Sequence, residues 1–124
     1  MSFRIEEKIV VTTQELFRLR ERLLQQGMSE LFPGRVIRSI YFDSRTNGMF
    51  VDSEEGSLPR KKIRIRSYDG STSLASLEMK VSSVEGRFKT AKNLSNKDRE
   101  QLIKNGFVDS RYGRCDPKVE VSYT

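Results

Sequence analysis

The sequence contains no histidine, no tryptophan and a single cysteine. Without histidine, a histidine base, a histidine metal ligand and a Ser-His-Asp triad are all excluded. The single cysteine, Cys115, cannot form an intramolecular disulfide, so the sequence gives no support for an oxidising compartment. Any metal in this protein is therefore expected to be a hard cation held by carboxylates or phosphate oxygens.

Long apolar runs are also absent. The N-terminal stretch MSFRIEEK lacks the apolar centre of a signal peptide, and no run approaches membrane-spanning length. We therefore expect a cytoplasmic protein or a cytoplasm-facing domain without a membrane span in this chain. The 124 residues are enough to bury one modest core but not two, so residues 1–124 are expected to form a single domain.

Basic residues outnumber acidic ones. The chain has 23 Lys and Arg against 17 Asp and Glu, a formal net charge of +6. This balance favours an anionic partner, and charge alone leaves nucleic acid, an acidic membrane surface and a phosphorylated small molecule open.

Apolar periodicity predicts an α+β domain with five or six mostly antiparallel strands and two helices. A capping box of Thr12 with Glu15 predicts a helix over 13–26, and a shorter helix is expected between Ser95 and Gly106. Runs that alternate or are rich in β-branched and aromatic residues predict strands over 3–11, 35–43, 61–68, 74–82, 87–92 and 118–123.

Two further segments complete this interpretation. Residues 44–60 hold several turn-forming residues and are expected to be a loop with at most one short turn of helix. Leu16, Leu19 and Leu23 stand at helical spacing, which is typical of a helix face packed in a core.

Charged residues share one face of the predicted strands. In the stretch KKIRIRSY, Lys62, Arg64 and Arg66 project together, because residues two apart on a strand face the same side. For any single strand, a solvated sheet face explains this pattern as well. Across neighbouring strands, however, two cations about 4 Å apart repel by roughly 4 kcal/mol at an effective dielectric near 20. An anion such as polyphosphate, inside a curved or closed sheet, would relieve that repulsion among Lys8, Arg64, Arg66, Lys80, Arg87 and Lys89.

Two carboxylates accompany these cations. Glu6 lies two residues before Lys8, and Glu78 lies two residues before Lys80, so each shares a strand face with its lysine. Such carboxylates commonly pair with neighbouring cations and hold them in place. Alternatively, Glu6 and Glu78 help to bind a Mg²⁺ or Mn²⁺ ion that enters with the phosphates.

Five segments of the chain, taken in order, form a recognisable set: FRIEEKIVV, IRSIYFDS, IRIRSYDG, SLEMK and GRFKTAK. Together they resemble the triphosphate tunnel metalloenzymes, the CYTH-like superfamily, and within it the VTC-type polyphosphate polymerase domain. The resemblance covers nearly the whole chain and implies a closed antiparallel tunnel whose inward lysines and arginines bind triphosphate or polyphosphate.

The resemblance also implies roles. Lys8, Arg64, Arg66 and Lys80 look like phosphate-gripping cations, and Arg87 and Lys89 look like further members of that set. Glu6 and Glu78 look like carboxylates of the tunnel wall. The implied reaction moves the γ-phosphate of a nucleoside triphosphate onto a phosphate chain, with Mn²⁺ or Mg²⁺ bridging the oxygens.

The chain departs from the family in length. Family tunnels are longer, and their second half brings further cations and the carboxylate that holds the metal. The matching part is therefore expected to be the N-terminal half, either as a fragment or as a natural half-tunnel. A half-tunnel leaves strand edges unpaired, so we hypothesise that a homodimer completes it.

Two other functions stay open. A nucleic-acid-binding module is the first, and it needs aromatic side chains among the cations; by parity only Tyr68 joins Arg66. A triphosphate hydrolase or cyclase-type relative of the same superfamily is the second. The segments YFDS and RIRSYDG favour the VTC type.

Overall fold

The computed structural model of the chain describes residues 5–69 and 71–124. The chain divides into two compact units, Met1–Pro33 and Gly34–Thr124. That residues 1–124 form a single domain stays a prediction.

In the first unit, the described residues 5–33 form one helix, α1 (Thr13–Gln25). Its start is the predicted capping box: Thr12 Oγ1 accepts from the backbone N–H of Glu15, and the Glu15 side chain accepts from the backbone N–H of Thr12. The strand predicted over 3–11 is wrong for residues 5–11, which form neither strand nor helix. Residues 3 and 4 of that prediction lie outside the described residues.

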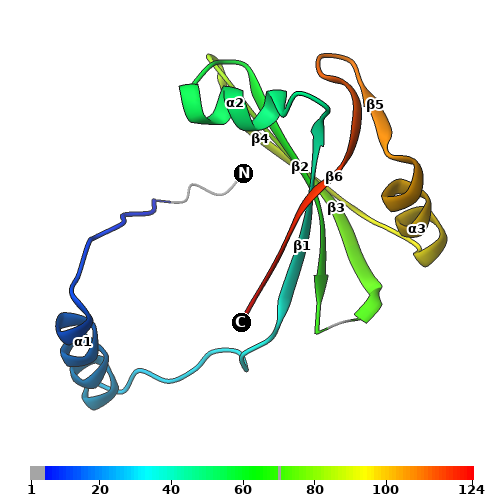
Figure 1. Cartoon of the computed structure of the whole chain (residues 1–124). Coiled ribbons are helices and arrows are strands. Elements are labelled where there is room, and N and C mark those ends of the chain that lie inside the picture. Colours follow the sequence, from blue (N-terminus) through cyan, green and yellow to red (C-terminus); the bar gives the residue numbers. More distant parts are fainter. Residues whose placement is uncertain (1–4, 70) are drawn as a thin grey trace. The chain divides into compact units, whose positions relative to one another are not determined.

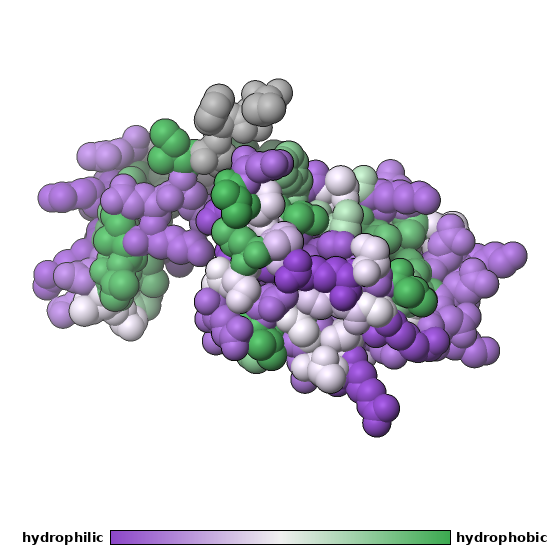
Figure 2. Space-filling model, turned by 90° about the horizontal axis from the view of Figure 1, so that it is seen from above, coloured by the Kyte–Doolittle hydropathy of each residue, from purple (hydrophilic) through white to green (hydrophobic). Residues whose placement is uncertain are grey.

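The apolar side of α1 is not buried within the first unit. Leu16 remains 51% exposed, Leu19 48% and Leu23 37%, so the prediction that they pack in a core is wrong for this unit by itself. In Figure 2 the hydrophobic residues of this helix form a band flanked by hydrophilic ones. The helix is amphipathic, and the first unit by itself does not cover its apolar face.

The second unit is built on one antiparallel sheet of six strands in the order β4-β3-β2-β1-β6-β5. The sheet is strongly curled, as a half-barrel (Figure 1). This confirms the predicted α+β class with a sheet that forms part of a barrel. The strands are β1 (Ile37–Ser44), β2 (Arg60–Tyr68), β3 (Ser71–Ser83), β4 (Gly86–Asn93), β5 (Phe107–Asp109) and β6 (Gly113–Tyr123).

Two helices belong to this unit. The predicted short helix is α3 (Asn96–Asn105), capped by the Ser95 side chain. The other, α2 (Gly48–Glu55), lies in the segment that we predicted to be a loop with at most one short turn of helix, and its 8 residues exceed that prediction. Its first turn is held by Asp43, whose carboxylate accepts from the backbone N–H groups of Ser44, Met49 and Phe50.

The core lies against one face of this sheet. On β2, the buried side chains of Ile63 and Ile65 alternate with Arg64, which projects to the other face. Leu102 and Ile103 of α3 pack against the core. In the part of the chain that the structure describes, no helix is long and apolar enough to cross a membrane.

Candidate functional site

The sheet register brings most of the predicted cations to one face. Arg64 lies opposite Glu78, Lys80 lies opposite both Lys62 and Lys89, and Ser82 lies opposite Arg87. Since directly opposed residues in a sheet share a face, these side chains line a single surface. We call it the cationic face, formed by Lys62, Arg64, Arg66, Glu78, Lys80, Arg87 and Lys89.

Glu78 is the centre of this face. It is only 6% exposed, and its Oε2 accepts a hydrogen bond of 2.6 Å from Nε of Arg64. Nε of Arg66 lies 3.9 Å from the same carboxylate, and Nζ of Lys89 lies 3.8 Å from its other oxygen. Burial alone would raise the pKa of Glu78, but the Arg64 hydrogen bond and the surrounding positive charges outweigh it and lower the pKa. Glu78 is therefore a charged anchor for the cations around it.

Tyrosines hold the outer ends of both arginines. Nη1 of Arg64 donates to the hydroxyl of Tyr41 at 3.1 Å, and Nη2 of Arg66 donates to the hydroxyl of Tyr123 at 3.3 Å. Burial disfavours the charged form of Arg64, but the hydrogen bonds with Tyr41 and Glu78 outweigh it, so its pKa is raised. Both guanidinium groups are thus held by hydrogen bonds, and that of Arg64 is stabilised in its charged form.

The lysines of the face differ from the arginines. Lys62, Lys80 and Lys89 form a row across β2, β3 and β4. Among residues 5–69 and 71–124, the salt bridges of this face join Glu78 to Arg64, Arg66 and Lys89, and leave Lys62 and Lys80 without an acidic partner. Like charges placed side by side repel. The row therefore has an excess of positive charge that a bound anion would neutralise.

A small cavity lies beside Lys62 and Lys80, the two lysines of this face without an acidic partner in the described residues. It has a volume of about 190 Å³, and Tyr41, Lys62, Arg64, Glu78 and Lys80 line it. Because the carboxylate is already engaged by Arg64, the cavity presents mainly hydrogen-bond donors. Such a lining suits an anion with several oxygen acceptors, such as a phosphate group.

One end of the face carries buried polar atoms without hydrogen-bond partners. Ser39 lies opposite Arg66 and is 1% exposed, and neither its Oγ nor the Nε of Arg66 makes a hydrogen bond within the described part of the chain. Buried polar groups are normally satisfied, so these two atoms are exceptions among the described residues.

Lys8 and Glu6 belong to the first unit. Their side chains lie 3.9 Å apart and are 88% and 61% exposed, respectively. That Lys8 joins the phosphate-binding cations, and that Glu6 joins the wall carboxylates, stays a prediction.

The described residues contain no group of three or more acidic or cysteine side chains that could hold a metal ion. Both oxygens of Glu78 face cations, Arg64 on one side and Lys89 on the other. Glu78 therefore pairs with neighbouring cations, which is one of the two roles predicted for it from the sequence. With both oxygens next to cations, Glu78 does not fit a metal centre built from the described protein groups alone. A metal role for Glu6 and Glu78 stays a prediction, and it would need phosphate oxygens as further ligands.

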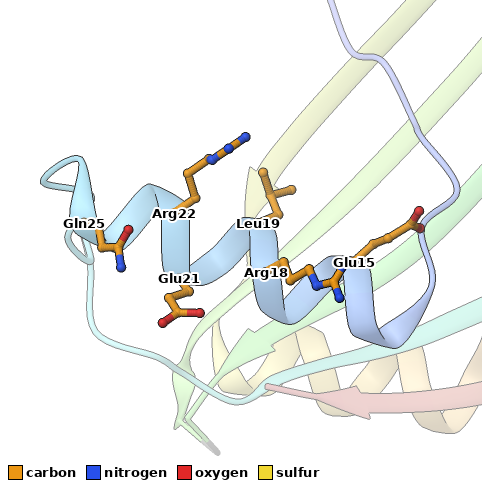
Figure 3. A pocket seen from close by; sticks show the side chains of 6 residues that line it. All are labelled: Glu15, Arg18, Leu19, Glu21, Arg22 and Gln25. Atoms are coloured by element: carbon orange, nitrogen blue, oxygen red, sulfur yellow. The ribbon is translucent and has the colours of Figure 1, made fainter.

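A second hollow lies along α1 (Figure 3). It has a volume of about 560 Å³, and it is lined by side chains of that helix alone, among them Glu15, Arg18, Glu21 and Arg22. Charges of both signs alternate along it. We do not regard this open helix surface as a functional site.

Several residues of the face were missed as site residues. Lys62 shares the parity of Arg64, which is a signal the sequence does contain. Tyr41 and Tyr123 are brought to the arginines by the pairing of β1 with β2 and with β6. The pairing of β1 with β2 also places Ser39 opposite Arg66, and no pattern in the sequence predicts this position.

Comparison with known families adds one finding. The family model of the VTC domain matches residues 3–121, which is nearly the whole chain. No curated protein matches the sequence.

Proposed function

The chain belongs to the VTC domain family, whose members share the fold of the triphosphate tunnel enzymes, and from this membership we propose that the protein binds polyphosphate or triphosphate on its cationic face. The family indicates a polyphosphate-related role. The cationic face supports the specific ligand, since the hydrogen-bond donors of Lys62, Arg64 and Lys80 line a cavity of about 190 Å³.

The observation that carries the proposal is the row of Lys62, Lys80 and Lys89 across three neighbouring strands. A fold that gains nothing from such a row would be expected to place an acidic or neutral residue at one of the three positions, because cross-strand repulsion is unfavourable. A phosphate chain running across the strands would put an anionic group beside each lysine in turn.

A titration calorimetry experiment with tripolyphosphate tests this proposal. The variant Lys62→Ala plus Lys80→Ala is expected to bind at least about tenfold more weakly than the wild type, since each lost contact to a charged group is worth roughly 1.5–3 kcal/mol. The matched control is Lys97→Ala plus Lys104→Ala, which removes the same charge from exposed positions of α3. An equal loss in both variants would mean that net charge, rather than this face, attracts the ligand.

Phosphoryl transfer is the second part of the proposal. The donor would be a nucleoside triphosphate, the acceptor a phosphate chain, and the contribution of the cationic face would be to position the phosphates and neutralise their charge. Mn²⁺ or Mg²⁺ would enter bound to those phosphates. A cytoplasmic location is part of the same proposal.

Completion of the half-barrel by a second copy is the third part. The sheet ends at β4 on one side and at β5 on the other, and strands at the edge of a sheet offer unpaired backbone groups to another chain. A homodimer formed through such an edge would bring two cationic faces together around one ligand.

A nucleic-acid-binding function is supported by one observation. Tyr123 is 46% exposed and lies beside Arg66, so the face offers an aromatic ring on which a base could stack. An electrophoretic shift with single-stranded RNA that survives an excess of polyphosphate would favour this function. Complete displacement by polyphosphate would favour the phosphate ligand.

A further inference from the structure

A larger hollow adjoins the cationic face, between α2 and the sheet. It has a volume of about 720 Å³, within the usual range of small-molecule sites. Tyr41 and Lys62 line both this hollow and the smaller cavity that holds Arg64 and Lys80. The two spaces therefore adjoin at these two side chains. We call the larger one the α2 hollow.

The lining of the α2 hollow is more apolar than the cationic face. Apolar side chains from β6, Val119 and Val121, form part of its wall, together with the buried Met49. Phe50 of α2 lines it and is 62% exposed, so its ring is open to a ligand. A polyphosphate chain would find little to bind on such a surface, whereas a flat aromatic group would bury apolar area there.

Polar groups stand among these apolar ones. The hollow also has Asn47, Ser53 and Glu54 in its lining, which supply amide, hydroxyl and carboxylate hydrogen-bonding groups. Lys62 and Lys118 add positive charge. The combination suits a ligand with an aromatic ring, several hydrogen-bonding atoms and an attached anion.

The hollow is formed by anchored elements. Asp43 accepts hydrogen bonds from the backbone N–H groups of Met49 and Phe50, which fixes the first turn of α2 to the end of β1. The β1–β6 pairing shifts register between Tyr41 and Phe42, and the extra β6 residue is Lys118. The shift allows Lys118 and Val119, neighbours in the chain, to line the same hollow.

We propose that the α2 hollow binds the base and ribose of a nucleoside phosphate whose phosphate groups extend past Lys62 onto the cationic face. The inference rests on the proposed function, since it takes the cationic face as the phosphate site. Phe50 would stack against the base, and Lys62, at the junction of the two cavities, would contact the phosphate nearest the ribose. The hollow thereby gives the protein a preference for a nucleotide over an inorganic phosphate chain.

The test compares ATP with tripolyphosphate by titration calorimetry on the full chain. The variant Phe50→Ala is expected to weaken ATP binding about fivefold or more, which is the lower range for loss of one base-stacking ring, and to leave tripolyphosphate binding unchanged. The matched control is Phe88→Ala on β4, which removes an equally exposed ring, 57% against 62%, that does not line the hollow. Circular dichroism verifies that both variants are folded.

The outcomes separate this inference from the proposed function. If the wild type binds both ligands and Phe50→Ala affects neither, or affects both equally, the α2 hollow is not the nucleoside site and the phosphate site stands. If Phe50→Ala and Phe88→Ala weaken ATP binding to the same extent, the inference is also overturned. If the wild type binds neither ATP nor tripolyphosphate, the proposed function fails, and the inference fails with it.

Discussion

Nε of Arg64 donates a hydrogen bond of 2.6 Å to Oε2 of Glu78, and the two side chains are only 14% and 8% exposed. The pair therefore has a structural role in addition to any ligand that Arg64 binds. A loss of phosphate binding on removal of Arg64 would have two explanations, since the variant also leaves a buried carboxylate with less compensation. Lys62 and Lys80, which have no such partner in the described residues, are the cleaner positions for a binding test.

The first prediction concerns this pair. Arg64→Ala is expected to lower the free energy of unfolding by about 3 kcal/mol, because removing one partner leaves the charge of Glu78 in a buried place. The double variant Arg64→Ala plus Glu78→Gln is expected to recover part of that loss, since it also removes the buried negative charge that Arg64 compensates. Urea unfolding followed by circular dichroism measures both. A double variant less stable than the single one would show that Arg64 is not needed to compensate Glu78.

The second prediction concerns acid stability. The folded-state pKa of Glu78 is lowered from its ordinary value of 4.5, so the unfolded state takes up a proton at a higher pH than the folded state does. The stabilisation is complete above that ordinary value and is lost as the pH falls through the lowered folded pKa. Melting temperatures between about pH 3 and 7 are expected to fall more steeply at the acid end in the wild type than in Glu78→Gln.

Asp109 is expected to keep some acid sensitivity in that variant. Burial alone would raise its pKa, but the salt bridge with Lys61, at 2.7 Å, and two backbone N–H donors outweigh burial and lower the pKa. Parallel curves for the wild type and Glu78→Gln would contradict a contribution from Glu78.

The third prediction concerns Gly106, which ends α3 with a φ of +65°. A Cβ at this position would meet the backbone carbonyl oxygen of Cys115 inside contact distance, so Gly106→Ala is expected to cost about 3 kcal/mol or more. Gly56 is the matched control: its φ is +69°, but the space around it is open. Gly56→Ala is expected to cost only the backbone strain of about 1–2 kcal/mol. If urea unfolding shows that both variants lose the same free energy of unfolding, the carbonyl group of Cys115 moves away from the added Cβ without an energetic cost.

The fourth prediction concerns the anchor of α2. Asp43→Ala removes the acceptor for three backbone N–H groups and is expected to destabilise the protein by about 2 kcal/mol, as the loss of a strong helix cap does. It is also expected to weaken ATP binding more than tripolyphosphate binding, because it loosens Phe50. Glu55→Ala, which removes an exposed carboxylate from the same helix, is the control and should change neither property.

The fifth prediction concerns assembly. Static light scattering at micromolar concentration is expected to give twice the chain mass of 14.4 kDa if a second copy pairs with a sheet edge. Dilution should then shift the mass toward the monomer as tripolyphosphate affinity falls. If the protein is monomeric after dilution and still binds tripolyphosphate with the same affinity, one cationic face is sufficient to bind the ligand.

The sequence predicted the second unit well where strand residues alternate strictly. Ile63 and Ile65 are buried and Arg64 projects to the other face, and the same alternation orients Glu78 and Lys80 on the neighbouring strand. Parity within a strand therefore identified which cations share a face. It did not identify which of them have acidic partners, because that depends on the register between strands.

Other features depend on contacts that periodicity does not encode. The helix α2 begins at Gly48 because Asp43, several residues earlier, accepts from its first N–H groups, and a turn-rich segment gives little sign of this. The register shift beside Tyr41 places Lys118 against the α2 hollow, although strict alternation would send it to the face opposite that of Val119. The predicted strand over 3–11 shows the converse: among residues 5–11, alternation with a period of two did not produce a strand, because a strand also requires a partner strand.

Phe50 of α2 and Lys62 of β2 both line the α2 hollow, and Asp43 fixes the first turn of α2 to the end of β1, the strand that pairs with β2. For a nucleotide bound as proposed, this anchoring would set the distance from the stacked base to the phosphate contact at Lys62. Nucleoside mono-, di- and triphosphates would share the position of the base and differ only in how far their last phosphate reaches toward Lys80 and Lys89. An insertion between Asp43 and Phe50 would shift that reach, and with it the phosphate number that the protein prefers.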